Sequence, residues 1–395
     1  MFYYIVLLQF NYDVILNFSV VNMNQDIFFM QKALELARQS KGRTLSNPLS
    51  GAIVVSNGEI VGEGFYSQSK NEHAEFNALE AAGEKAQGAT LYTVLEPCIN
   101  KGKFKSCSSY IQDRGIKRVV VAMEDPNPSV KGKGLASLFD SSMELTFGIE
   151  KEAAEKLNEV YIKYYGIKLP FVNMVNAMTL DGKIATHMGD REWIVGDESR
   201  ACLHEMRASY DVVMVGVNTI IKDNPQISCK SQGGRDPIKL VVDSYGKTPL
   251  NSKIFIKSAK DDHKPRVIIA VSGHASDEKI RSLTAAGAEV IVCSDERNDD
   301  SPFGRVDLKK LMYNLGKKGI TSILLEGGGI LNASALDDDI VDKVSMFISP
   351  KIVGGKDAIT SVEGQGSSLM SQAKELKRVT YTTKGNDILI EGYTK

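Results

Sequence analysis

A histidine, a glutamate and two cysteines in the first half of the chain have the spacing of a catalytic zinc site. Glu75 follows His73 on one short motif, and Cys98 and Cys107 come after the next apolar run. One imidazole and two thiolates leave the fourth position of a Zn²⁺ ion for water, whose pKa then falls to about 7. Glu75 is the candidate for moving a proton from that water to a departing amine. The four residues therefore predict a hydrolytic zinc deaminase.

Two simpler interpretations compete with this one. His73 alone would be an ordinary surface histidine, and the cysteines alone would be small buried side chains. The pair Pro97-Cys98 after His-Ala-Glu matches the zinc-deaminase signature, although the gap to Cys107 is longer than the Cys-x-x-Cys of nucleic-acid deaminases. A structural zinc module is the other alternative, and Glu75 argues against it because such a module needs no carboxylate beside the metal.

Further motifs accompany this group in a fixed order. They are Ser46-Asn47-Pro48, Val61-Gly62-Glu63-Gly64, His73-Ala74-Glu75, Leu95-Glu96-Pro97-Cys98, Cys107 and Asp125-Pro126-Asn127-Pro128. Together they resemble the deaminase half of the bifunctional riboflavin-biosynthesis deaminase/reductase family. The resemblance implies loss of the 2-amino group from a diaminopyrimidinone ribosylamine 5′-phosphate. It also implies that Asn47 and Lys103 bind this substrate.

The chain departs from the family pattern in the substrate loop. Tyr66 stands where the family usually has histidine, and the segment Ile99–Ser106 reads INKGKFKS instead of Ser-His-His-Gly-Arg-Thr-Pro-Pro. Lys103 there takes the place of an arginine. These changes keep open a paralogue of a specialised pathway whose deaminase substrate has changed.

The second half of the chain resembles the reductase domain of the same family, whose fold is similar to dihydrofolate reductase. The motifs that carry the resemblance are Thr179–Ala185, Trp193-Ile194, Leu203–Ala208, Val215-Gly216, Thr219, Asp223-Asn224-Pro225 and Leu325–Gly329. The resemblance implies that NADPH reduces the ribosyl side chain of the deaminated substrate to ribityl. Arg191 departs from the pattern, since the family usually has a small serine there.

The resemblance also implies roles for residues of this half. Asp223 and Lys183 are the candidates for steadying or polarising the sugar. The candidate cofactor contacts are Ala177, Trp193, Thr219, Asp223, Gly328 and Gly329. The candidate substrate contacts are Arg207, Ile227, Lys230 and Glu326. A strand over 320–325, a glycine turn and a helix over 330–336 would bring backbone N–H groups to a pyrophosphate.

The elements that must position these residues alternate between helix and strand. In the first half we expect a helix over 26–40 with Asp26 as its cap, a hairpin turning at Asn57-Gly58, and further elements over 73–82, 89–95, 108–114 and 117–123. In the second half we expect strands over 171–177, 212–216, 238–243, 267–271, 290–293 and 321–325, a helix over 306–318, and an antiparallel edge pair over 343–348 and 388–392. This alternation predicts an α/β protein with a mixed first sheet.

The domain boundary is expected at Leu169-Pro170, after a charged helical segment over 151–168. The chain then divides into 1–22, a zinc deaminase domain over 23–168 and a reductase domain over 169–395. The apolar segment 1–22 lacks the features of a signal peptide and is interrupted by polar residues, so an over-long start before Met23 is the favoured interpretation. A peripheral membrane anchor is its alternative.

Composition restricts the partners and the compartment. The 48 Lys and Arg nearly balance the 49 Asp and Glu, so neither nucleic acid nor an anionic membrane is an expected partner. Five scattered cysteines indicate a reducing compartment, which we take to be the cytoplasm. The oligomeric state, including a homo-oligomer, stays open.

Overall fold

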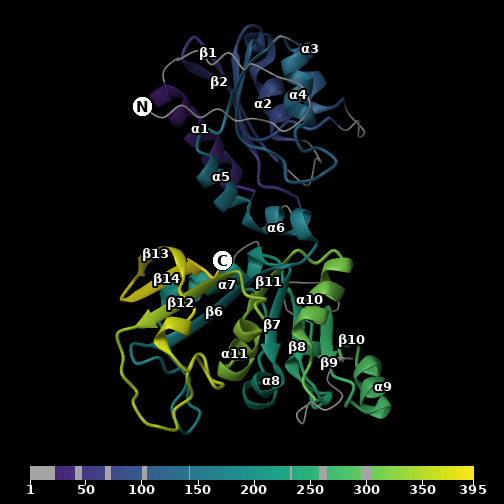
Figure 1. The fold of residues 1–395 in the computed structure, drawn as a ribbon, viewed down its shortest axis with the longest axis vertical. Coiled ribbons are helices and arrows are strands. Elements are labelled where there is room, and N and C mark those ends of the chain that lie inside the picture. Colours follow the sequence, from purple (N-terminus) through teal and green to yellow (C-terminus); the bar gives the residue numbers. More distant parts are fainter. Residues whose placement is uncertain are drawn as a thin grey trace.

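The computed structural model describes residues 23–40, 47–66, 73–99, 105–141, 143–231, 234–257, 265–294 and 304–395. Two α/β units lie one above the other in Figure 1, and helix α6 (Glu159–Ile167) lies between them. Segment 1–22 and Lys103 fall outside the described residues, so the predictions made for them are not addressed by the structure.

The first unit is built on a five-stranded mixed sheet in the order β2-β1-β3-β4-β5. The strands are β1 (Gly51–Ser56), β2 (Glu59–Phe65), β3 (Thr90–Leu95), β4 (Arg118–Met123) and β5 (Glu144–Phe147). Asn57 and Gly58 join β1 to β2 with positive φ angles of 52° and 81°, as tight hairpins require. The β1 pairings are antiparallel and the β3-β4-β5 pairings parallel, which confirms the expected mixed sheet.

Helices cover both faces of this sheet. Helices α1 (Met23–Arg38) and α5 (Lys151–Leu157) pack on one face. Helices α2 (Ala74–Ala82), α3 (Cys107–Asp113) and α4 (Lys133–Asp140), with the short 3₁₀ turn η1 (Gly83–Ala86), pack on the other. Asp26 is not the cap of α1: the helix begins at Met23, and the buried Asp26 carboxylate binds the Arg118 guanidinium in a bidentate pair at 2.7 and 2.9 Å.

Gly64 allows α2 to lie directly against β2. A Cβ atom at Gly64 would come 2.3 Å from the Ala74 carbonyl oxygen and 2.4 Å from the Ala78 nitrogen, both of which belong to the helix backbone. The motif glycines are therefore explained by packing: they bring the helix that follows His73 close to the sheet.

We expect Gly64→Ala to destabilise the first unit by about 1–3 kcal/mol or more, because the helix backbone has to move away from the strand. Calorimetric unfolding of the full chain should show a lower Tm for this variant. The matched control is Gly166→Ala in α6, where a Cβ would meet nothing within 4 Å and where alanine is the better helix former. An unchanged Tm in Gly64→Ala would contradict the packing explanation.

The second unit is built on a nine-stranded sheet in the order β10-β9-β8-β7-β11-β6-β12-β14-β13. Its strands are β6 (Phe171–Thr179), β7 (Val212–Gly216), β8 (Ile238–Val242), β9 (Val267–Val271), β10 (Ala288–Val292), β11 (Ser322–Leu325), β12 (Lys343–Ser349), β13 (Lys377–Lys384) and β14 (Asp387–Tyr393). The pairings from β10 to β12 are parallel, and β14 and β13 add an antiparallel end. The predicted antiparallel pairing of β12 with β14 is therefore confirmed. The prediction that this pair forms the edge of the sheet was wrong, because β13 pairs with β14 and is the edge strand.

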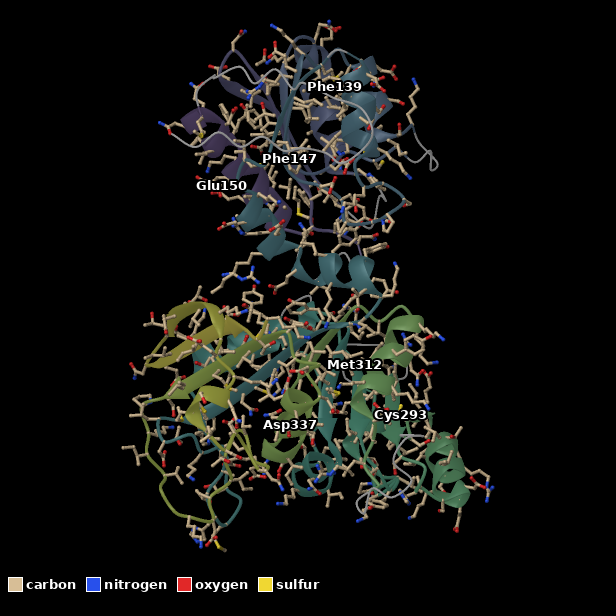
Figure 2. The ribbon with its side chains drawn as sticks, viewed as in Figure 1. Phe139, Phe147, Glu150, Cys293, Met312 and Asp337 are labelled. Atoms are coloured by element: carbon tan, nitrogen blue, oxygen red, sulfur yellow. The ribbon has the colours of Figure 1, made fainter. Side chains whose placement is uncertain are left out.

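Helices also sandwich this sheet. Helices α7 (Asp197–Ser209), α8 (Val217–Asp223) and α9 (Asp277–Ala285) contribute to one core, and α10 (Leu308–Lys317) and α11 (Gly329–Asp337) contribute to the other. Short 3₁₀ turns, η2 (Lys253–Phe255) and η3 (Met370–Gln372), complete the elements. Side chains fill the spaces between sheet and helices, as Met312 of α10 does (Figure 2).

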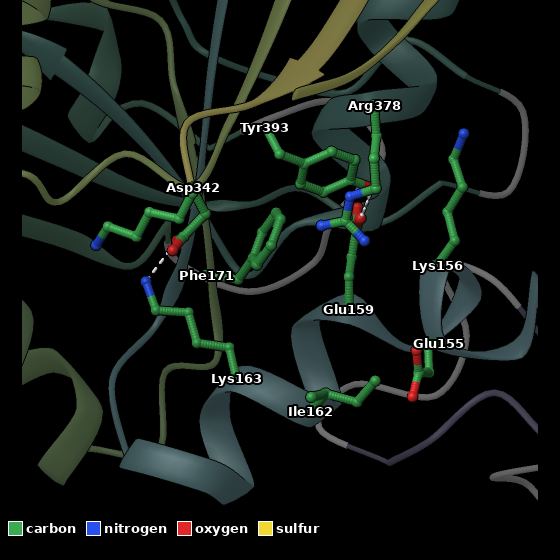
Figure 3. A pocket seen from close by; sticks show the side chains of 10 residues that line it. Glu155, Lys156, Glu159, Ile162, Lys163, Phe171, Asp342, Arg378 and Tyr393 are labelled. Carbon is green, nitrogen blue, oxygen red and sulfur yellow. Dashed lines mark hydrogen bonds and ion pairs between the residues drawn. The ribbon is translucent and has the colours of Figure 1, made fainter. Parts of the chain in front are cut away.

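The helical segment between the sheets is broken where one continuous helix was expected. Asn158 has φ −106° and ψ 19°, so α5 ends at Leu157 and α6 starts again at Glu159 in a new direction (Figure 1). Lys163 of α6 forms an ion pair with Asp342 of the second unit, and the Tyr393 hydroxyl donates to Glu159 (Figure 3). These residues line a cavity of about 360 Å³ at the junction.

Candidate active sites

The residues predicted to bind zinc meet at one edge of the first sheet. β3 and β4 run parallel and end side by side, with Leu95 opposite Met123. Cys98 follows the first of these strands and Asp125 the second. α2 starts at the same edge with His73 as its N-cap residue, whose side chain makes no capping hydrogen bond. The imidazole of His73 can therefore turn toward the cysteines.

The three predicted ligands form a compact donor set. The His73 Nδ1 atom lies 3.2 Å from Cys107 Sγ and 3.5 Å from Cys98 Sγ, and the ligand atoms of all three residues lie within 4.8 Å of one another. Among the described residues this is the one group of His, Cys, Asp and Glu close enough to hold a metal ion. One nitrogen and two sulfur donors at this spacing fit Zn²⁺, with room for a fourth ligand.

Without a metal, hydrogen bonds among the three donors set their pKa values. Hydrogen bonds from Cys107 and His73 lower the pKa of Cys98 to about 4 against the opposing effect of burial. The pKa of Cys107 is raised by its hydrogen bond to Cys98 and by burial. The hydrogen bond with Cys98 raises the pKa of His73 to about 9. Zn²⁺ binds thiolate and neutral imidazole, so binding of the ion would displace the protons that these hydrogen bonds favour on His73 and Cys107.

Glu75 lies beside the donor set and is nearly inaccessible. Its side chain is 4% exposed, its Oε1 accepts a hydrogen bond from Thr93 at 3.0 Å, and its Oε2 is 3.6 Å from Cys107 Sγ. Burial raises the pKa of Glu75 above that of an ordinary carboxyl group. A carboxyl group with a raised pKa beside a water-binding metal site can both take up and release a proton.

Asn47 and Tyr66 lie close to the histidine. The Asn47 side-chain amide donates to the Tyr66 hydroxyl at 3.0 Å, and the Tyr66 and His73 rings are 6.1 Å apart. Tyr66, which departs from the family pattern, is therefore hydrogen-bonded to Asn47, the residue predicted to bind the substrate.

Glu96 has a structural role that sequence reasoning missed. Its carboxylate accepts backbone N–H groups of Asp125, Gly132, Gly134 and Leu135 at 2.8–3.2 Å. The one sequence feature that could have indicated this role is the position of Glu96 within the motif Leu-Glu-Pro-Cys. Glu96 thereby ties the loop after β4 to the loop that carries Cys98.

The predicted reductase residues gather at the carboxyl ends of neighbouring parallel strands. Ala177 lies on β6, Thr219 follows β7 in α8, and Glu326 and Gly328 follow β11. These strands are adjacent in the order β7-β11-β6. In open α/β sheets ligands bind outside the carboxyl ends of the strands, so the placement agrees with a binding site.

Arg207 and Glu326 were both expected to contact substrate, but they bind each other. Arg207 Nε and Nη2 donate to the two Glu326 carboxylate oxygens at 2.6 and 2.5 Å. With no ligand bound, the guanidinium fork is therefore paired with Glu326. His204 lies on α7, and its buried Nδ1 has no hydrogen-bond partner in the described residues. Burial, together with the positive charges of Arg207 and Lys230, lowers the pKa of His204 to about 4.

Arg191 binds Asp223, the candidate sugar-polarising carboxylate. The Arg191 Nη1 to Asp223 Oδ2 distance is 2.7 Å, and both side chains are about three-tenths exposed. Asp223 is the last residue of α8 and does not lie at the outlet of a strand. The residue that replaces the family's serine is thus a direct partner of a predicted catalytic group.

Three other predicted residues have unusual backbone or contacts. Trp193 and Ile227 have positive φ angles of 59° and 49°, which are strained for a bulky and a β-branched residue. Trp193 is 60% exposed and the Arg200 guanidinium stacks on its ring at 4.0 Å. Lys183 Nζ donates to the Ala358 carbonyl at 3.4 Å. Backbone strain that persists in a folded protein is frequent at ligand sites.

The N-terminus of α11 fits a phosphate group in part. Gly328 is its N-cap residue, without a side-chain cap, and a Cβ there would meet nothing within 4 Å. At Gly329 a Cβ would meet Glu363 Cγ at 2.5 Å, so an acidic side chain packs beside the expected pyrophosphate position. The open backbone favours an anion, whereas Glu363 opposes one.

Comparison with known proteins agrees with both halves. The family profile for the cytidine and deoxycytidylate deaminase zinc-binding region matches residues 23–123, and the profile for the RibD C-terminal domain matches residues 170–390. The fold and the two sites thus define an enzyme with a zinc-binding deaminase region followed by a reductase domain.

The similar proteins extend this match over nearly the whole chain. The riboflavin biosynthesis protein RibD of Actinobacillus pleuropneumoniae is 40% identical over 93% of this chain and 94% of its own length, and that of Bacillus amyloliquefaciens is 33% identical over 93% and 96%. The crystal structure of a diaminohydroxyphosphoribosylaminopyrimidine deaminase/5-amino-6-(5-phosphoribosylamino)uracil reductase from Thermotoga maritima is 34% identical, with a TM-score of 0.79 over 94% of this chain and 99% of that one. The chain belongs to the RibD family of bifunctional deaminase/reductases in riboflavin biosynthesis.

These findings confirm the expected family and the α/β fold class, with a deaminase domain before a reductase domain. In the described part of the chain, no helix is both long and apolar enough to cross a membrane.

Proposed function

We propose that this chain deaminates 2,5-diamino-6-ribosylamino-4(3H)-pyrimidinone 5′-phosphate and then reduces the ribosyl side chain of the product to ribityl with NADPH. The grouping of His73, Cys98 and Cys107 next to buried Glu75 carries the first half of the proposal. The Thermotoga maritima protein is described as a deaminase and reductase of this pyrimidine chemistry, which supports the substrate class.

His73, Cys98 and Cys107 would hold the zinc ion. Bound there, zinc would supply a water molecule acidic enough to attack the pyrimidine at neutral pH. Glu75 takes a proton from the attacking water and gives it to the amino group, so that a C–O bond forms, the C–N bond breaks and ammonia leaves. Asn47 and Tyr66 orient the ring beside His73, and Lys103 is retained as a substrate contact.

The reductase half would bind NADPH at the carboxyl ends of β6, β7 and β11. Ala177, Trp193, Thr219, Gly328 and Gly329 would form the cofactor side, and NADPH would supply the hydride. Asp223 and Lys183 would act on the sugar. The substrate side would consist of Arg207, Ile227, Lys230 and Glu326. We further propose that the boundary between the two domains lies at 168/169 and that the protein is cytoplasmic. Its partner is a small-molecule substrate and not a nucleic acid.

The decisive test is product analysis. Purified protein is incubated with the diaminopyrimidinone substrate with and without NADPH, and the products are identified by mass. Deamination without NADPH, followed by reduction once NADPH is added, is the expected result. NADH should replace NADPH poorly.

A second candidate, a paralogue with a changed substrate, is favoured by two specific residues. Tyr66 and Arg191 replace the family's histidine and serine, and each contacts a predicted site residue. A zinc-loaded protein that fails to deaminate the diaminopyrimidinone would favour this candidate.

Arg191 should tune the pH dependence of reduction through Asp223. Burial raises the pKa of Asp223, and the nearby positive charge of Arg191 lowers it. In Arg191→Ser the lowering contribution is lost, so the carboxyl group stays protonated to a higher pH. If the ionised form of Asp223 is required, the acidic limb of the reduction profile should move up by about one pH unit, the low end for a carboxylate beside arginine.

The control for this prediction is Asp223→Asn, which should remove the acidic limb together with most of the activity. The measurement is kcat/KM for reduction of the deaminated substrate from pH 5 upward. A limb that stays in place in Arg191→Ser would exclude Asp223 as the titrating group.

A further inference from the structure

The junction between α5 and α6 is bonded to a segment beside the deaminase site. The buried Asn158 side chain accepts the Leu49 N–H at 2.8 Å and donates to the Leu49 carbonyl at 3.0 Å. This is the paired contact that a neighbouring strand would make. Leu49 is two residues from Asn47, which donates to the hydroxyl of Tyr66, and the Tyr66 ring lies 6.1 Å from that of His73.

Tyr161, one turn further along α6, is bonded to a second segment of the same site. Its hydroxyl donates to Asp125 Oδ1 at 3.0 Å and lies 3.4 Å from Oδ2. Tyr161 and Asp125 are both buried, at 8% and 6% exposure. Asp125 Oδ1 also accepts the Asn127 N–H at 2.8 Å, so the Tyr161 hydroxyl reaches the residue that orders this loop.

The two segments lie on either side of the loop that carries Cys98. β3, which leads into that loop, pairs with β1 on one side and with β4 on the other. Residues 47–50 precede β1, and residues 124–127 follow β4. Because β1 is antiparallel to β3 and β4 is parallel to it, both segments emerge at the edge where Cys98 lies.

We propose that Asn158 and Tyr161 are positioning residues of the deaminase site, which hold the segments around Asn47 and Asp125 at the correct distance from the donor cluster. This role rests on the proposed deaminase function. Neither residue touches the donor atoms, so each acts on substrate binding through the segment that it holds.

The same helix is fixed from its other side by the reductase domain. Glu159 accepts from the Tyr393 hydroxyl, and Lys163 pairs with Asp342 (Figure 3). Glu159 also lies 3.5 Å from Lys343 Nζ, and the Tyr164 hydroxyl donates to the Gly316 carbonyl at 3.2 Å. Lys163 and Asp342 are only 16% and 13% exposed. Docking of the reductase domain therefore contributes to the geometry of the deaminase site.

The test compares Tyr161→Phe and Asn158→Asp with wild type in the full-length, zinc-loaded protein. The first variant removes one hydroxyl, and the second keeps the acceptor for the Leu49 N–H but removes the donor to its carbonyl. In each we expect the KM for deamination to rise about tenfold, the effect of one lost hydrogen bond of ordinary to charge-assisted strength. The kcat for deamination, the zinc content and the reductase activity should change less than about twofold.

Tyr165→Phe is the matched control. Tyr165 lies on the same helix with its ring 4.5 Å from that of Tyr161, and its hydroxyl makes no hydrogen bond within the described residues. This variant should keep the wild-type KM. An unchanged KM in Tyr161→Phe and Asn158→Asp, or a fall in zinc content together with kcat, would overturn the positioning role.

Amide hydrogen exchange distinguishes failure of this inference from failure of the proposed function. If the wild-type protein does not turn over the diaminopyrimidinone, the proposed function fails. The positioning role still predicts faster exchange at residues 47–50 in Asn158→Asp and at residues 124–128 in Tyr161→Phe. Wild-type exchange rates in both segments would overturn it regardless of the substrate.

Discussion

Glu75→Gln is expected to keep its zinc and to lose deamination by about two to four orders of magnitude, the usual contribution of a positioned acid–base group. The substitution preserves the shape of the side chain and its ability to accept from Thr93, which bonds Glu75 Oε1 at 3.0 Å. It removes the group that can carry a proton. Since Glu75 is not one of the three donors within 4.8 Å of one another, metal binding should persist.

The matched control is Glu80→Gln on the same helix. The Glu80 side chain is half exposed and pairs with Arg114 and Tyr110, away from the donor cluster. This variant should deaminate normally. Both variants are compared by single-turnover deamination, bound zinc and reductase activity. If Glu75→Gln turned over at a near-normal rate, Glu75 would not be the proton carrier.

Much of the fold could be predicted because strong local patterns fix it. The apolar β-branched run before Met123 and the apolar run before Glu96 identify β4 and β3, and both strands are almost wholly buried. The positive φ angles of Asn57 and Gly58 explain why that pair marked a hairpin. Short-range patterns of this kind depend on the chain's own geometry.

What could not be predicted depends on contacts between distant segments. β13 was missed because it is an edge strand, paired on one side and exposed along most of its length, so its sequence is largely polar. The helix break was missed at Asn158, whose side chain pairs with Leu49, more than a hundred positions away. Local propensity contains no information about either contact.

The site residues show the same division. The spacing of His73, Cys98 and Cys107 sufficed to predict a donor cluster, because metal ligands tolerate little variation in chemistry. The pairing of Arg207 with Glu326 was not predicted, although both were assigned to one site. Two oppositely charged side chains at one binding site can pair with each other when the ligand is absent. The sequence does not say whether such side chains contact each other or the ligand.

Cys107→Ala should abolish stable zinc binding and deamination together. Cys107 is the first residue of α3, it is 6% exposed, and its Sγ lies 3.2 Å from His73 Nδ1. Its removal leaves one imidazole and one thiolate, fewer than the three protein ligands of catalytic zinc sites. Metal analysis after gel filtration should give about one zinc per chain for wild type and little for the variant.

Cys293→Ala is the control, because this cysteine is also buried but lies in the reductase domain (Figure 2). It should keep wild-type zinc and both activities. Thermal unfolding adds an independent measurement: a ligand that binds only the folded state raises the Tm, so added zinc should stabilise zinc-depleted wild type and Cys293→Ala but not Cys107→Ala. Full zinc content with normal deamination in Cys107→Ala would show that another residue is the third ligand. Loss of zinc with deamination intact would exclude the metal from the reaction, and would leave Glu75 without the water molecule that it is proposed to deprotonate.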